Sequence, residues 1–146
     1  MSFRLTYATM FNPPEAMHER FERSLAKIRG ELGRTQRLFI DGRDHDANTH
    51  QERVSPIDHD LKLGRFPMAQ LKDVDAALAA ASKAFPAWRA TSAVERARFM
   101  RRVADIMEER VYDIAAALVL EVGKVRLEAL AEAQETVDFF RCYADD

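Results

Sequence analysis

The chain has 146 residues, of which 47% are hydrophobic and 32% charged, as expected for one globular domain. Its 22 basic and 24 acidic residues nearly balance to a net charge of −2, and no long stretch has one sign. This pattern excludes the basic face that binding to nucleic acid or an anionic membrane requires. No apolar run reaches the roughly 18 residues of a membrane span, and a signal peptide is absent. The single cysteine, Cys142, cannot form an internal disulfide. Together these features predict a protein of the reducing cytoplasm.

The first predicted helix covers residues 13–32, after an extended arm at residues 1–11. Asn12 can cap the helix, Pro13 suits its first position, and Glu15 is placed to complete a capping box. One apolar face recurs at intervals of three and four residues, formed by Met17, Phe21, Leu25, Ile28 and Leu32. Gly33 is predicted to end the helix in the left-handed conformation.

Three short strands are predicted next. Residues 38–40 form an apolar strand that enters a turn at Asp41-Gly42, and residues 53–57 form a second strand that ends at a proline. Residues 61–68 provide the third. The polar stretch 43–51 between the first two is predicted to be exposed and outside any strand.

From residue 71 onward the sequence predicts helices. A stripe of apolar residues ends at Pro86, where a break or kink is expected; the stripe consists of Val74, Leu78, Ala81 and Phe85. Ser92 and Glu95 form a capping box for a long helix, which should kink or restart near Arg110. Gly123 is expected to end this stretch, and a last helix begins near Val125. Its predicted inward residues are Leu127, Leu130, Ala133 or Gln134, Val137 and Phe140.

The predicted fold class is mainly α with a small antiparallel β-hairpin or sheet (α+β). The strands precede most of the helices, so no βαβ unit is predicted. We expect a single partial domain over residues 1–146, with an arm and helix at 1–35, a hairpin region at 36–70 and a helical part at 71–146. Two acids at the end of the last helix oppose its dipole, which suggests a cut end.

Three segments in order resemble the aldehyde dehydrogenase superfamily. They are residues 38–43 with Ser55-Pro56-Ile57-Asp58; residues 73–81 with Ala84-Phe85-Pro86-Ala87-Trp88 and Glu95-Arg96-Ala97; and Glu121-Val122-Gly123-Lys124 with Glu128, Ala129 and Glu132. The helix at 13–32, Phe3-Arg4, Glu135-x-x-Asp138-Phe139 and Tyr143-Ala144 are similar to the 1-pyrroline-5-carboxylate (L-glutamate γ-semialdehyde) dehydrogenases of proline catabolism.

The resemblance implies the N-terminal part of the aldehyde dehydrogenase fold, with the parallel Rossmann-like sheet missing. It implies a parent enzyme, expected to be a homo-oligomer, that oxidises an aldehyde to a carboxylate with NAD as hydride acceptor. The family's nucleophilic cysteine, its base and its glycine-containing phosphate site all lie beyond the matched segment. We therefore expect no catalytic or NAD-binding residue in residues 1–146, and an inactive chain when alone.

Within this chain, the resemblance makes Glu135 the candidate substrate-binding residue, since a carboxylate there can pair with the substrate's ammonium group. The alternative is a solvated helix acid. Cys142 lies late in an apolar-faced helix and not in a glycine-flanked loop, so we interpret it as a structural thiol.

Two further motifs are interpreted as structural. Glu121-Val122-Gly123-Lys124 lacks the spaced glycines and the hydroxyl of a phosphate loop. A calcium loop starting at Asp44 would need glycine at its sixth position and glutamate at its twelfth, where Thr49 and Ser55 stand. No metal site is therefore predicted.

The expected partner is the remainder of a dehydrogenase chain, or a second copy through self-association. Residues 115–120 are consecutively apolar, so a helix containing them should expose apolar surface unless another segment covers it. The alternative function is a stand-alone helical scaffold module derived from the family, without catalysis. An open reading frame continuing into a glycine-rich phosphate site and a cysteine loop would distinguish the two.

Overall fold

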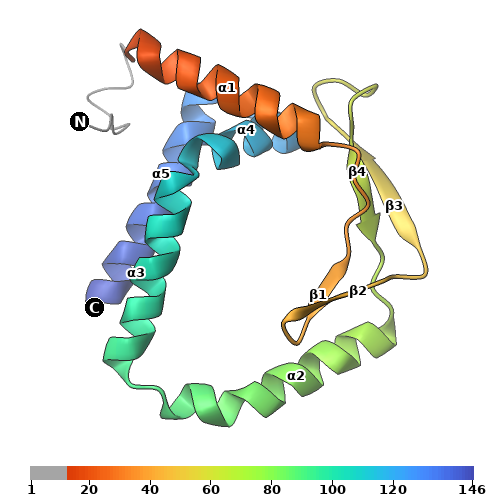
Figure 1. The fold of residues 1–146 in the computed structure, drawn as a ribbon, viewed down its shortest axis with the longest axis vertical. Helices are drawn as coiled ribbons and strands as arrows, with labels where there is room; N and C mark the ends of the chain where they lie inside the picture. The colour runs from red at the N-terminus through yellow and green to blue at the C-terminus, as the bar shows by residue number, and fades with distance from the viewer. Residues whose placement is uncertain (1–12) are drawn as a thin grey trace.

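The computed structural model describes residues 13–146, so the predicted arm at residues 1–11 and the Asn12 cap lie outside the described residues. Figure 1 shows the chain as an open ring of helices and hairpins. The elements are α1 (Glu15–Glu31), β1 (Leu38–Ile40), β2 (Arg43–His45), β3 (His50–Val54), β4 (Lys62–Pro67), α2 (Leu71–Ala90), α3 (Ala93–Glu109), α4 (Val111–Val122) and α5 (Arg126–Asp145). The predicted mainly helical class with small antiparallel hairpins is confirmed.

The core lies where α5 packs along α3 and α4 and where α1 crosses α4 (Figure 1). Many of its fully buried positions are alanines, namely Ala104, Ala115, Ala116, Ala129 and Ala133. Small side chains at a helix contact permit a short distance between the helix axes. The larger buried residues Met17 and Phe21 come from α1. This helix therefore packs into the core through the apolar face that the spacing of its hydrophobic residues predicted.

The apolar run at residues 115–120 is packed into this core and does not form an exposed face. Ala115, Ala116 and Leu120 are at most 2% exposed, and the other three residues are half-buried. The expectation that the chain exposes apolar helix surface is therefore not met at this helix, because other segments of the chain cover it. α4 avoids exposure because α1 covers one of its sides and α5 another.

The first hairpin turns at Asp41 and Gly42, as predicted. Their φ angles of +53° and +75° are both left-handed, which suits a tight hairpin turn between twisted strands. The turn directs the chain back onto β1, so Leu38 pairs with His45 in an antiparallel register. The prediction that residues 43–51 lie outside strands was wrong, because this turn imposes pairing on a polar sequence that has no apolar alternation.

The second hairpin pairs β3 with β4 in a separate two-stranded sheet. The strand predicted at 53–57 begins earlier and ends at Val54, before Pro56, while the strand predicted at 61–68 is confirmed as β4. Gly64 of β4 lies against the segment that follows the end of α1. A Cβ at Gly64 would approach the Arg34 carbonyl oxygen to 2.8 Å, so the close passage of these two segments requires glycine.

Local capping signals set some of the helix ends. Ser92 accepts a hydrogen bond from the Glu95 amide and caps α3, as predicted. The predicted restart near Arg110 is the α3–α4 junction, and Gly123 ends α4 with a φ of +78°. At Pro86 the sequence predicted a break or a kink. A break does not occur, since α2 continues to Ala90: a proline removes one helical hydrogen bond without preventing the following turn.

One buried hydrogen bond joins the second hairpin to the helical bundle. Ser55 is fully buried, and its hydroxyl donates to the Leu120 carbonyl oxygen at 2.5 Å. Leu120 lies in the last turn of α4, where carbonyls lack partners within the helix. Ser55 therefore satisfies a helix-terminal acceptor from a segment 65 residues away.

Replacing Ser55 with alanine is expected to lower the free energy of unfolding by about 1–3 kcal/mol, because the Leu120 carbonyl loses its partner in a buried place. Chemical denaturation monitored by circular dichroism measures the loss. Ser82→Ala on exposed α2 makes the same chemical change and is the control. Equal stability of the two variants would show that the Ser55 hydrogen bond contributes nothing.

Candidate functional site

Glu135 lies on α5, on the side that faces away from the core. The buried side of this helix carries Ala129, Leu130, Ala133, Gln134 and Val137, which confirms the predicted inward face. Glu135, Phe139 and Tyr143 follow one another at intervals of four residues and are all exposed. The rings of Phe139 and Tyr143 stack with centroids 6.0 Å apart and an interplanar angle of 15°. The exposed side of α5 thus presents a carboxylate beside a pair of aromatic rings, which we call the α5 outer face.

One other acid of the α5 outer face, Glu132, differs from Glu135 because it has an ion-pair partner. Lys124 Nζ lies 2.5 Å from Glu132 Oε2. The hydrogen bond and charge of Glu132, with a smaller contribution from Glu128, raise the pKa of Lys124 above its ordinary value. Among the described residues, Glu135 has no ion pair of this kind. A free carboxylate next to aromatic rings is suited to an organic ammonium group.

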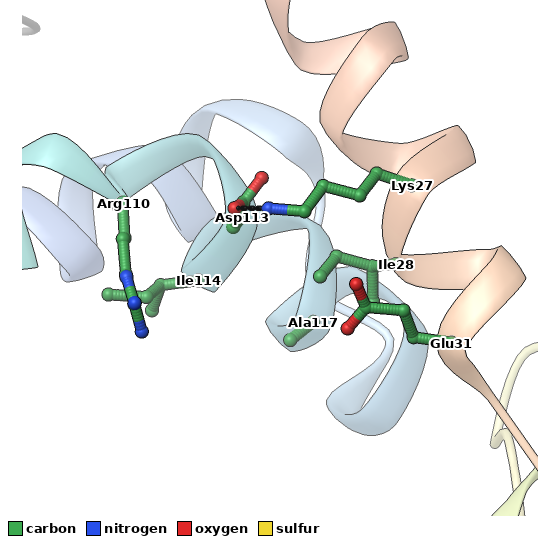
Figure 2. Close-up of a pocket in the computed structure, with 7 residues that line it drawn as sticks. All are labelled: Lys27, Ile28, Glu31, Arg110, Asp113, Ile114 and Ala117. Atoms are coloured by element: carbon green, nitrogen blue, oxygen red, sulfur yellow. Dashed lines mark hydrogen bonds and ion pairs between the residues drawn. The ribbon is translucent and has the colours of Figure 1, made fainter. Parts of the chain in front are cut away.

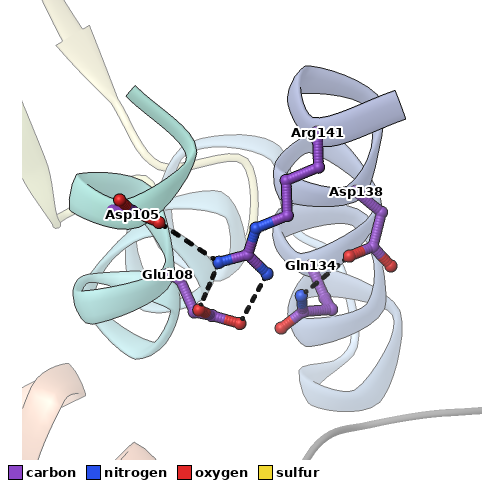
Figure 3. A network of polar contacts seen from close by, with 5 residues as sticks. All are labelled: Asp105, Glu108, Gln134, Asp138 and Arg141. Atoms are coloured by element: carbon purple, nitrogen blue, oxygen red, sulfur yellow. Dashed lines mark hydrogen bonds and ion pairs between the residues drawn. The ribbon is translucent and has the colours of Figure 1, made fainter. Parts of the chain in front are cut away.

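A polar network fixes how α5 sits against α3 (Figure 3). Arg141 Nη1 and Nη2 donate to the two oxygens of Glu108 at 3.1 and 2.6 Å, and Nη2 lies 3.4 Å from Asp105. These carboxylates raise the pKa of the Arg141 guanidinium above its ordinary value, Glu108 having the larger effect. On the same helix, Gln134 donates to Asp138 at 3.2 Å. A bidentate pair between α3 and α5 restricts rotation of α5, and so sets the direction of its outer face.

The described residues also form an open pocket of about 410 Å³ between α1 and α4. Figure 2 shows Lys27 reaching from α1 to Asp113 of α4, with Nζ and Oδ2 2.5 Å apart. The Lys27 hydrogen bond is the main reason why the pKa of Asp113 lies below its ordinary value. Since its central charges neutralise one another, we interpret this pocket as a brace between the two helices. The sequence offered no signal for it, because its two sides are 86 residues apart.

The other features considered from the sequence do not form a functional site among the described residues. Cys142 is exposed near the end of α5, and within residues 13–146 no hydrogen bond links it to a base. No group of three or more histidine, cysteine or acidic side chains in this part of the chain is arranged to hold a metal ion. None of the helices over the same residues is both long and apolar enough to cross a membrane. Glu135 therefore remains the candidate contact for a ligand.

The comparisons with known proteins agree with the predicted resemblance. A 1-pyrroline-5-carboxylate dehydrogenase of Staphylococcus haemolyticus is 35% identical over 126 residues, covering 86% of this chain and 24% of that protein. A 1-pyrroline-5-carboxylate dehydrogenase 2 of Bacillus subtilis matches with the same identity and coverage. The structure of a 1-pyrroline-5-carboxylate dehydrogenase from Thermus with bound NAD superposes with a TM-score of 0.88 and 32% identity, over 99% of this chain and 28% of that one.

The chain therefore spans about a quarter of the length of these relatives. Its helices and hairpins reproduce part of their fold, which confirms the predicted part of the aldehyde dehydrogenase fold. Residues 13–146 contain no ladder of parallel strands. A model of the aldehyde dehydrogenase family matches residues 43–146, more than half of the sequence. The chain belongs to the aldehyde dehydrogenase family.

Proposed function

We propose that this chain is the N-terminal part of an NAD-dependent dehydrogenase that oxidises L-glutamate γ-semialdehyde, the open form of 1-pyrroline-5-carboxylate, to glutamate. The similarity to the NAD-bound Thermus enzyme along 99% of the chain carries the proposal. Curated relatives from several bacteria carry the same enzyme name. In the complete enzyme, NAD would supply the hydride acceptor, and the nucleophile and the base would come from segments outside residues 1–146.

Glu135 is the residue through which this chain would contact the substrate. Glutamate semialdehyde carries an ammonium group at the end opposite its aldehyde, and the carboxylate of Glu135 is available to pair with it. The stacked rings of Phe139 and Tyr143 lie along the next two turns and offer an apolar wall beside that charge. Arg141 and Glu108 hold the helix in place. The role of Glu135 is binding and orientation, with no part in bond breaking.

Glu135→Ala in the complete enzyme is expected to lower kcat/KM for glutamate semialdehyde by about tenfold to a hundredfold, which corresponds to roughly 1–3 kcal/mol of lost transition-state stabilisation. Steady-state kinetics measure the change. Glu135→Gln, which keeps the shape and removes the charge, should behave similarly. Glu19→Ala, at an exposed position of α1, is the control with unchanged kinetics. Unchanged kcat/KM in both Glu135 variants would leave this residue as a solvated surface acid.

A second candidate function is a stand-alone, non-catalytic scaffold module. The observation that favours it is the continuous core formed by α1, α3, α4 and α5. The two candidates differ in what the coding sequence holds after Asp146. A frame that continues into a glycine-rich phosphate site and a cysteine loop supports the dehydrogenase, and an immediate stop supports the module.

A further inference from the structure

The pocket between α1 and α4 contains more charged groups than the brace uses. Its ionisable side chains are Lys27 and Glu31 of α1, Asp113 of α4, and Arg110, which caps the start of α4. Lys27 and Asp113 pair with each other. Within residues 13–146, neither Arg110 nor Glu31 has an ion-pair partner of its own. The pocket therefore contains one cation and one anion that the brace does not neutralise.

These two charges lie at opposite ends of the pocket. The Lys27 hydrogen bond is the largest cause of the lowered pKa of Asp113, and the charge of Arg110 adds to it, so both cations lie near this carboxylate. That end has a surplus of positive charge. Figure 2 shows Glu31 on the other side of the Lys27–Asp113 pair from Arg110, with its carboxylate directed toward α4. The pocket is therefore positive at one end and negative at the other.

The lining between the two ends is apolar. It consists of Ile28 from α1 and of Ile114 and Ala117 from α4, all of them half-buried. An apolar concave surface with a few polar groups that fix orientation is the usual form of a small-molecule site, and such sites have volumes of about 300–1,000 Å³. The volume of about 410 Å³ lies within this range.

We propose that this pocket binds a zwitterionic α-amino acid with an aliphatic side chain. The ligand's carboxylate pairs with Lys27, whose ammonium group has donors left after its bond to Asp113. The charge of Arg110 offsets the repulsion from Asp113. The ligand's ammonium group pairs with Glu31, and its side chain lies against the apolar lining.

The spacing of the charges determines this class of ligand. Lys27 and Glu31 are four residues apart on α1, so their Cβ atoms are separated by about 5–6 Å. An α-amino acid carries both of its charges on one carbon atom, and it therefore reaches both side chains at once. A ligand with a single charge leaves one end of the pocket unpaired. A charged side chain would lose its hydration against the apolar lining.

Nuclear magnetic resonance titration of isotope-labelled residues 1–146 with L-leucine tests the proposal. Leucine is expected to shift the amide resonances of Ile114 and Ala117 with a dissociation constant of about 1 mM or lower, as for a ligand of its size. Two analogues separate the contacts: 4-methylpentanoate lacks only the ammonium group, and 3-methylbutylamine lacks only the carboxylate. Each should bind at least about tenfold more weakly than leucine.

Two variants locate the contacts on the protein. Glu31→Gln should weaken leucine binding at least about tenfold and leave 4-methylpentanoate unaffected, because the deleted charge faces the ammonium group. Arg110→Gln should weaken both ligands. Glu19→Gln, at an exposed position of α1 outside the pocket, is the matched control and should bind both ligands as the wild type does. Circular dichroism checks that all three variants are folded.

The outcomes decide between a binding site and a brace alone. Equal affinity of the wild type and Glu31→Gln for leucine would overturn the proposal. Binding of leucine and 4-methylpentanoate with equal affinity by the wild type would overturn it too, since the ammonium group would then contribute nothing. No change in the Ile114 and Ala117 resonances at the solubility limit of L-leucine would show that the pocket is only a brace.

Discussion

Purified residues 1–146 are expected to produce no NADH from L-glutamate γ-semialdehyde. A general base alone contributes about 10²–10⁴-fold to a rate, and the activated nucleophile is a further requirement. Within residues 13–146, Cys142 is exposed on α5 and has no hydrogen bond to a base that could activate it. Spectrophotometric detection of NADH at high protein concentration measures the activity.

The control for this measurement is Cys142→Ser. If the wild-type chain produced NADH and Cys142→Ser did not, Cys142 would be the nucleophile and the interpretation of this residue as structural would be contradicted. If both produced NADH equally, a contaminating enzyme would be responsible, and the assay would be repeated on protein from a host lacking that enzyme.

Phe21→Ala is expected to lower the free energy of unfolding by about 3–5 kcal/mol. Phe21 is 1% exposed in the core shared by α1, α4 and α5, and large cavities left by an aromatic ring do not collapse fully. The substitution also removes the ring over which the Arg126 guanidinium lies, 4.5 Å from the ring centroid. Urea denaturation measures the difference.

Phe39→Ala is the matched control, since Phe39 of β1 is 72% exposed. Its effect should stay within about 0.5 kcal/mol, as for most surface substitutions. A Phe21→Ala variant as stable as Phe39→Ala would show that α1 does not form part of the core in solution.

The features predicted correctly from the sequence are those with local causes. Ser92 and Gly123 set helix ends through their own side chain or backbone, and the apolar spacing of α1 places Phe21 inward. The turn at Asp41-Gly42 was predicted for the same reason. Each of these signals acts within a few residues, so its consequence does not depend on the rest of the fold.

The features that the sequence did not predict depend on distant segments. Nothing near Ser55 indicates that its hydroxyl satisfies the Leu120 carbonyl across 65 residues. Residues 115–120 and the stripe on α2 are both apolar, and only tertiary packing shows that the first is buried and the second exposed. Periodicity identifies a face for burial but does not identify the segment that buries it.

Of the candidate site, too, one part was predicted from the sequence and the other part required the structure. The resemblance pointed to Glu135, and the structure adds that its side chain is exposed beside the stacked Phe139 and Tyr143. The orientation of α5 depends on Arg141 and its pairing with Glu108 of α3, which the sequence showed only as a mixture of charges. The rest of the substrate pocket in our proposal belongs to segments outside this chain.

The most direct test of the account is NADH formation by the complex of this chain with the Staphylococcus haemolyticus enzyme lacking the matched segment. The account predicts NADH from glutamate semialdehyde only when both parts are present, with activity reduced by Glu135→Gln in this chain. A stable complex that binds NAD but oxidises no glutamate semialdehyde would contradict it.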